Sequence, residues 1–138
     1  MASPILFKSS DVERQWDSDS RKHPMLDLVV GDFADAAYEE AGWLPVMTSF
    51  IRTHEEDREL GGSGIHPTGR AADFRTRGVP RQAVSWAVDY LNGKYQYDPR
   101  RPSLPVAYAK PHGNGPHLHI QVHDETVLRP GFRAGGDD

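Results

Sequence analysis

Hydrophobic positions recur every three or four residues in two stretches of the chain, and this spacing predicts two amphipathic helices. The first covers residues 25–41, and Gly42 stands where a helix C-cap glycine is expected. The second opens after Gly78-Val79-Pro80 and ends at Asn92-Gly93. The buried stripes are expected to be Leu26, Val29, Val30, Phe33, Ala37 and Ala41 in the first helix, and Ala83, Val84, Ala87, Val88 and Leu91 in the second.

Three shorter segments, at 46–52, 106–109 and 117–123, have the composition or alternation of β-strands. The first ends in Arg52, and a polar, glycine-rich loop follows it. In the last strand, a period of two separates the side chains into two faces. Leu118, Ile120 and Val122 share one face, and His117, His119, Gln121 and His123 share the other. We expect the apolar face to enter the core and the polar face to carry the chemistry.

These elements predict a small α+β domain over residues 25–125, in which two helices cover one face of an antiparallel sheet of about four strands. Residues 1–24 are polar and are interpreted as an N-terminal arm, a surface loop that wraps the domain. Residues 126–138 are interpreted as a flexible C-terminal tail. The length of 138 residues and a hydrophobic fraction of 37% fit one domain with one core.

Composition and charge exclude several classes of partner. The net charge is −4 and the Lys and Arg residues are dispersed among acids, so nucleic-acid binding is not expected. The chain has no long apolar run that would predict stable membrane association. It also has no apolar heptad that would predict a dimer, so we expect a monomer. The N-terminus lacks the apolar run of a secretory signal, which predicts synthesis in a cytoplasm.

Two short motifs together predict a metal site. The chain has no cysteine, so any zinc must be held by His, Asp or Glu. His66 and Asp73 stand at the two ends of a tight segment that contains Gly69, and His117 and His119 share a strand face. A His, Asp and His set gives zinc three ligands and leaves a fourth position open for water, as in catalytic sites. The alternatives are a turn with incidental polar residues and a solvated strand face.

The motifs resemble those of a known group of enzymes. The pattern His-x-x-Gly-x-Ala-x-Asp, followed by His-x-His and preceded by Ser63, is similar to that of the LAS-type zinc peptidases. That group includes D-alanyl-D-alanine carboxypeptidases, phage endolysins, penicillin-insensitive murein endopeptidases, lysostaphin-like peptidases and the hedgehog N-terminal domain. The similarity spans about half of the chain, from the Arg52 strand to His123. It implies a hedgehog/D,D-peptidase-like fold with a zinc cleft on the open face of the sheet.

The resemblance also implies roles for individual residues. His66, Asp73 and His119 are expected to bind Zn²⁺, and His117 is expected to act as a base on the attacking water. Arg52 is expected to stabilise charge on a substrate oxygen. The candidate substrate-binding residues are Ser63, Arg70 and His112. For Arg70 the alternative is a surface ion pair, and for His112 it is an ordinary surface histidine.

The implied function is hydrolysis of a peptide bond in the stem peptides of bacterial peptidoglycan, by a phage or prophage endolysin that acts at the cell wall. The alternative origin is a bacterial host enzyme. Many relatives carry an acidic residue three positions before the last ligand, where this chain has Pro116. The His-x-His form is closer to the murein endopeptidase and lysostaphin branches. The missing acid favours one alternative, a zinc-binding but non-catalytic module similar to hedgehog. A virion structural component with a vestigial site is a second.

Overall fold

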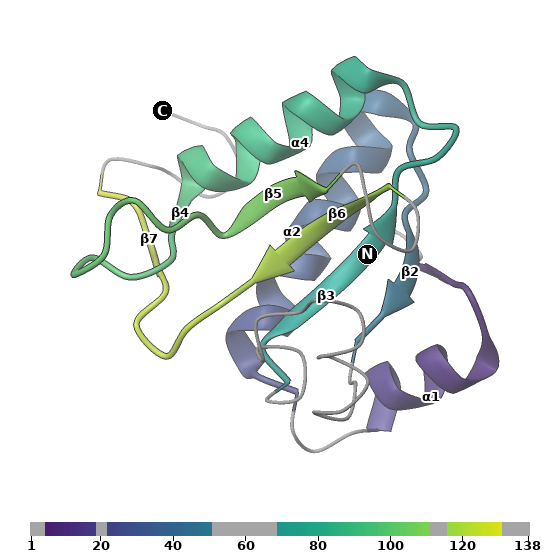
Figure 1. Ribbon diagram of the computed structural model, residues 1–138, viewed down its shortest axis with the longest axis horizontal. Coiled ribbons are helices and arrows are strands. Elements are labelled where there is room, and N and C mark those ends of the chain that lie inside the picture. Colours follow the sequence, from purple (N-terminus) through teal and green to yellow (C-terminus); the bar gives the residue numbers. More distant parts are fainter. Residues whose placement is uncertain (1–4, 19–21, 51–68, 111–115, 131–138) are drawn as a thin grey trace.

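A mixed five-stranded sheet lies at the centre of the fold, with strand order β1-β2-β3-β6-β5 (Figure 1). The computed structural model describes residues 5–18, 22–50, 69–110 and 116–130. β1 pairs in parallel with β2, and all other neighbours in this sheet are antiparallel. The strands are β1 (Leu6–Phe7), β2 (Val46–Ser49), β3 (Ala71–Arg75), β5 (Ala107–Lys110) and β6 (His117–Gln121). The predicted α+β class is confirmed, but the purely antiparallel sheet is wrong because β1 adds a parallel edge.

Both predicted amphipathic helices are present, as α2 (Pro24–Ala41) and α4 (Arg81–Lys94). In Figure 1, α2 lies behind the sheet and α4 runs alongside the edge strand β5, and α4 packs against both α2 and β5. A separate two-stranded sheet joins β4 (Tyr95–Gln96) to β7 (Val127–Leu128), so the interpretation of residues 126–138 as a flexible tail is wrong for this strand. None of the helices in the described ranges is long and apolar enough to cross a membrane.

Local chemistry sets both ends of α2. At its N-terminus His23 is the capping residue, and its Nδ1 accepts a hydrogen bond from the Met25 backbone N–H at 3.0 Å. At its C-terminus Gly42 has a φ of 64°, and its N–H donates to the Tyr38 carbonyl. The predicted glycine cap is therefore confirmed, and His23, which sequence alone left without a role, starts the helix.

The N-terminal arm is more ordered than a surface loop. It contains β1 and a helix, α1 (Ser10–Ser18), so the loop interpretation is wrong for these residues. Asp11 and Glu13 lie in the first turn of α1, where negative charge favours the helix dipole. Trp16 is buried, and its ring makes an edge contact with Phe50 at 5.0 Å. One aromatic side chain therefore joins this segment to the core.

The core lies between the helices and the sheet. Phe33 of α2 makes edge-to-face contacts with Trp43 at 5.2 Å and with Phe74 of β3 at 5.1 Å. Fully buried partners include Leu26, Val29, Val30, Met47, Leu91, Leu118, Ile120 and Val122. Because strand side chains alternate, the burial of Phe74 against α2 turns its neighbour Asp73 toward the other face of the sheet.

A polar cluster joins the two helices that cover the sheet. Asp32 of α2 accepts hydrogen bonds from the hydroxyls of Tyr90 at 2.8 Å and Tyr95 at 2.6 Å, and it forms an ion pair with Lys94 at 2.7 Å. Burial, and then the bond to Asp32, raises the pKa of both tyrosines. Burial alone would lower the pKa of Lys94, but its bonds to Asp32 and Tyr90 raise it. All three groups hold their protons more tightly in the folded chain.

This cluster predicts a loss of stability at alkaline pH. A group whose pKa is raised by folding stabilises the fold below its ordinary pKa, here 10.0 for tyrosine and 10.5 for lysine. That contribution is lost as the pH rises from there toward the folded-state values. Asp32→Asn should lower the free energy of unfolding by about 1.5–3 kcal/mol at pH 7 and weaken the alkaline dependence.

Urea denaturation followed by circular dichroism between pH 7 and pH 11 measures both effects. Asp89→Asn is the matched control, because Asp89 is an exposed carboxylate on α4. Its free energy of unfolding should stay within about 0.5 kcal/mol of the wild-type value. Equal alkaline curves for wild type and Asp32→Asn would contradict this account of the cluster.

Candidate functional site

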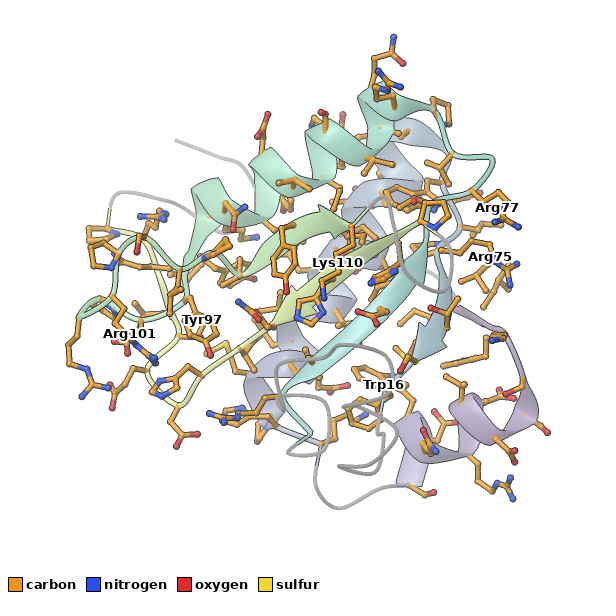
Figure 2. All side chains as sticks on the ribbon, in the orientation of Figure 1. Trp16, Arg75, Arg77, Tyr97, Arg101 and Lys110 are labelled. Carbon is orange, nitrogen blue, oxygen red and sulfur yellow. The ribbon has the colours of Figure 1, made fainter. Side chains whose placement is uncertain are left out.

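The polar face of β6 lies on the open side of the sheet. Leu118 and Ile120 are fully buried on the helix side, so His117, His119 and Gln121 face away from α2. In Figure 2, Lys110 at the end of β5 lies in front of the sheet, on the side opposite α2. The predicted separation of the strand into an apolar and a polar face is confirmed.

Strand register places Asp73 of β3 directly opposite His119 of β6. The Val122 N–H donates to the Arg70 carbonyl, and the Thr76 N–H donates to the Pro116 carbonyl. These bonds make Arg70–Val122 and Thr76–Pro116 hydrogen-bonded pairs of the ladder. Hydrogen-bonded and non-hydrogen-bonded pairs alternate along an antiparallel ladder, so Asp73 and His119 form a non-hydrogen-bonded pair. In such pairs the side chains approach most closely, so the two residues meet on the open face.

The Asp73 carboxylate faces both histidines of the His-x-His motif. Its Oδ1 lies 2.9 Å from His119 Nδ1, and its Oδ2 lies 3.7 Å from His117 Nε2. Asp73 is only 5% exposed and His119 only 2%. A carboxylate withdrawn from water in this way needs polar or charged partners, and the two imidazoles supply them.

His119 is also held on its other sides. Its Nε2 lies 3.1 Å from Gln121 Oε1, and the Gln121 amide nitrogen donates to the Pro105 carbonyl at 2.8 Å. The Tyr108 ring lies 4.7 Å from the imidazole, tilted by 35°. Burial, and then the charge of Asp73, raises the pKa of Tyr108, so its hydroxyl keeps its proton. The imidazole therefore has a defined orientation.

The donors of this pair fit one cation. Two donors at about 2.0–2.2 Å from a tetrahedral zinc ion are roughly 3.3 Å apart, close to the separation of Asp73 Oδ1 and His119 Nδ1. Among the described residues, no group of three or more His, Cys, Asp or Glu is arranged to hold a metal ion. The expected ligand His66 lies outside those residues, as do Arg52, Ser63 and His112. Their assignments stay predictions.

Arg70 lies immediately before β3, where its carbonyl accepts the Val122 N–H. Its charge contributes to a lowered pKa of Asp124, after the larger effect of the hydrogen bond from His23. Its substrate-binding role stays a prediction. The ion-pair alternative for Arg70 also stays a prediction.

Two residues of this face were missed by sequence reasoning. β5 pairs with β6 so that Tyr108 lies opposite His119 and Lys110 lies opposite His117. The Lys110 amine lies 5.5 Å from the centre of the Tyr108 ring. The sequence predicts a strand at 106–109, but it does not indicate which other strand pairs with it. His123, in contrast, lies apart, with its ring 5.6 Å from that of Tyr97.

Comparisons with known proteins find no match: no protein-family model, no curated protein and no solved structure corresponds to this chain.

Proposed function

We propose that this chain is a zinc-dependent peptidase that cleaves a peptide bond in bacterial peptidoglycan, with the hedgehog/D,D-peptidase-like fold of the LAS group. The observation that carries the proposal is the buried pair of Asp73 and His119, 2.9 Å apart on adjacent strands, with His117 on the same face. This pair joins one residue from each of the two sequence motifs.

Asp73 through its carboxylate and His119 through Nδ1 would hold the zinc ion together with His66. When bound there, zinc would polarise the scissile carbonyl and bring the pKa of a coordinated water to about 7. The remaining work falls to residues of this chain. Arg52 would steady the developing charge on the carbonyl oxygen.

His117 is the proposed general base. Its imidazole borders the ligand pair, with Nε2 at 3.7 Å from Asp73 Oδ2, and it is less buried than His119. It can therefore be reached by both water and substrate. In the proposed reaction His117 accepts a proton from the attacking water and returns it to the leaving amine.

The rim of the site supports an anionic peptide as substrate. Lys110 lies across from His117 in register, and its amine stands near the Tyr108 ring beside His119. A cation next to an aromatic ring suits a peptide segment that carries carboxylates, such as the stem peptide of peptidoglycan. An endolysin of phage or prophage origin, acting at the cell wall, fits this chemistry.

Pro116 favours a second candidate, a zinc-binding module without hydrolytic activity. Pro116 stands where many relatives have an acidic residue, and its carbonyl accepts the Thr76 N–H. The proline side chain has no acidic or basic group, so it cannot act as a general base. The two candidates differ in one respect, because the binding module would hold zinc and leave peptidoglycan intact.

Replacement of His119 tests the site directly. His119→Ala should reduce bound zinc from one equivalent to near zero and abolish lysis of purified peptidoglycan, because it removes a ligand. His123→Ala is the matched control, since His123 follows the same strand but contacts Tyr97 instead. It should keep both properties. Elemental analysis and mass spectrometry of released muropeptides measure them, and lysis by His119→Ala would contradict the proposal.

His117 should separate binding from turnover. His117→Ala should keep one equivalent of zinc but lower kcat by about 10²–10⁴-fold, the range of a lost general base. Zinc content and muropeptide release are compared on the same preparation. Wild-type turnover by His117→Ala would refute its role, and zinc binding without turnover in the wild type would favour the binding module.

A further inference from the structure

Gln121 is the one residue of the open β6 face that the proposed reaction does not use. Its amide oxygen lies 3.1 Å from His119 Nε2, the ring nitrogen that faces away from Asp73. We propose that Gln121 is a positioning residue, which holds the proton on Nε2 and so leaves the Nδ1 lone pair free for the ion shared with Asp73. This inference rests on the proposed zinc site.

The orientation of the Gln121 amide is fixed by a second hydrogen bond. Its nitrogen donates to the Pro105 carbonyl at 2.8 Å, two residues before β5 begins. A flipped amide would place its oxygen against that carbonyl oxygen, so two acceptors would face each other. The Pro105 carbonyl therefore directs the amide oxygen of Gln121 toward His119, where only an N–H is a suitable partner.

The two ring nitrogens of His119 both face oxygen atoms. Nδ1 lies 2.9 Å from Asp73 Oδ1, and Nε2 lies 3.1 Å from Gln121 Oε1. A neutral imidazole has a single N–H, so it can donate to only one of them. If Gln121 receives that hydrogen bond, a lone pair of Nδ1 points at a carboxylate. A cation between Nδ1 and Asp73 turns this repulsion into attraction.

Burial makes the role of Gln121 hard to replace. His119 is only 2% exposed and the Tyr108 ring lies against it at 4.7 Å, so water has little access to the imidazole. The Gln121 backbone is also fixed, because its N–H donates to the Val106 carbonyl at 2.8 Å. Loss of the amide oxygen would leave a buried N–H unsatisfied in this orientation of the ring.

Two substitutions separate the two ends of the amide. Gln121→Leu removes the acceptor for His119, and Gln121→Glu keeps an acceptor but loses the donor to Pro105. Zinc dissociation constants are measured by competition with a chromophoric chelator. We expect Gln121→Leu to bind zinc about 10–100-fold more weakly, and Gln121→Glu to stay within about tenfold of the wild type. Thermal unfolding of the metal-free variants checks that all three proteins fold.

Long-range ¹H–¹⁵N spectra of the zinc-loaded wild type should show a His119 ring protonated at Nε2 and metal-bound through Nδ1. A proton on Nδ1, an unchanged zinc affinity of Gln121→Leu, or an equal loss in both variants would overturn the inference. The expected affinities and spectrum in a protein that cleaves no peptidoglycan would support the inference and refute only the proposed hydrolysis. A wild-type chain that binds no zinc would overturn both.

Discussion

The register between β3 and β6 is the constraint on which the candidate site depends. Phe74 packs against Phe33 of α2, and Leu118 and Ile120 are fully buried on the same side of the sheet. A slip of β6 by one residue would turn Leu118 and Ile120 to the open face and draw His119 into the core, away from Asp73. The hydrophobic core therefore fixes which polar side chains meet, although it contains none of them.

The polar groups on the open face carry a cost that the fold has to offset. Asp73 and His119 are almost fully buried, and each is held by at least one polar partner. Apolar residues would fill a half-buried strand face without that cost. Departures of this kind from simple patterning are expected at functional sites, which is the physical reason for treating this face as one.

Sequence alone predicted the features that depend on local periodicity. Both long helices follow from apolar positions three or four apart, and the Gly42 cap follows from its place after the last of them. The two faces of β6 follow from alternation. The helix at Ser10–Ser18 was missed because its apolar side consists of Val12 and Trp16, a single pair four residues apart and too short a pattern to identify a helix. The parallel pairing of β1 was missed because two residues carry too little signal.

Contacts between strands could not be read in the same way. That Asp73 faces His119 follows from the β3–β6 register, and that Tyr108 covers the imidazole follows from the order of strands in the sheet. Both depend on long-range packing, and the spacing of residues within one segment carries no information about it. The alternation of side chains placed Gln121 on the polar face. Its proposed positioning role depends on the hydrogen bond to the Pro105 carbonyl, which lies next to it because β5 pairs with β6.

Anomalous X-ray diffraction from zinc-soaked crystals, recorded on both sides of the zinc absorption edge, tests the central claim most directly. The account predicts one strong peak on the open face of the sheet, about 2.0–2.2 Å from both Asp73 Oδ1 and His119 Nδ1. Strong peaks elsewhere on the protein, with none between these two atoms at saturating zinc, would contradict it.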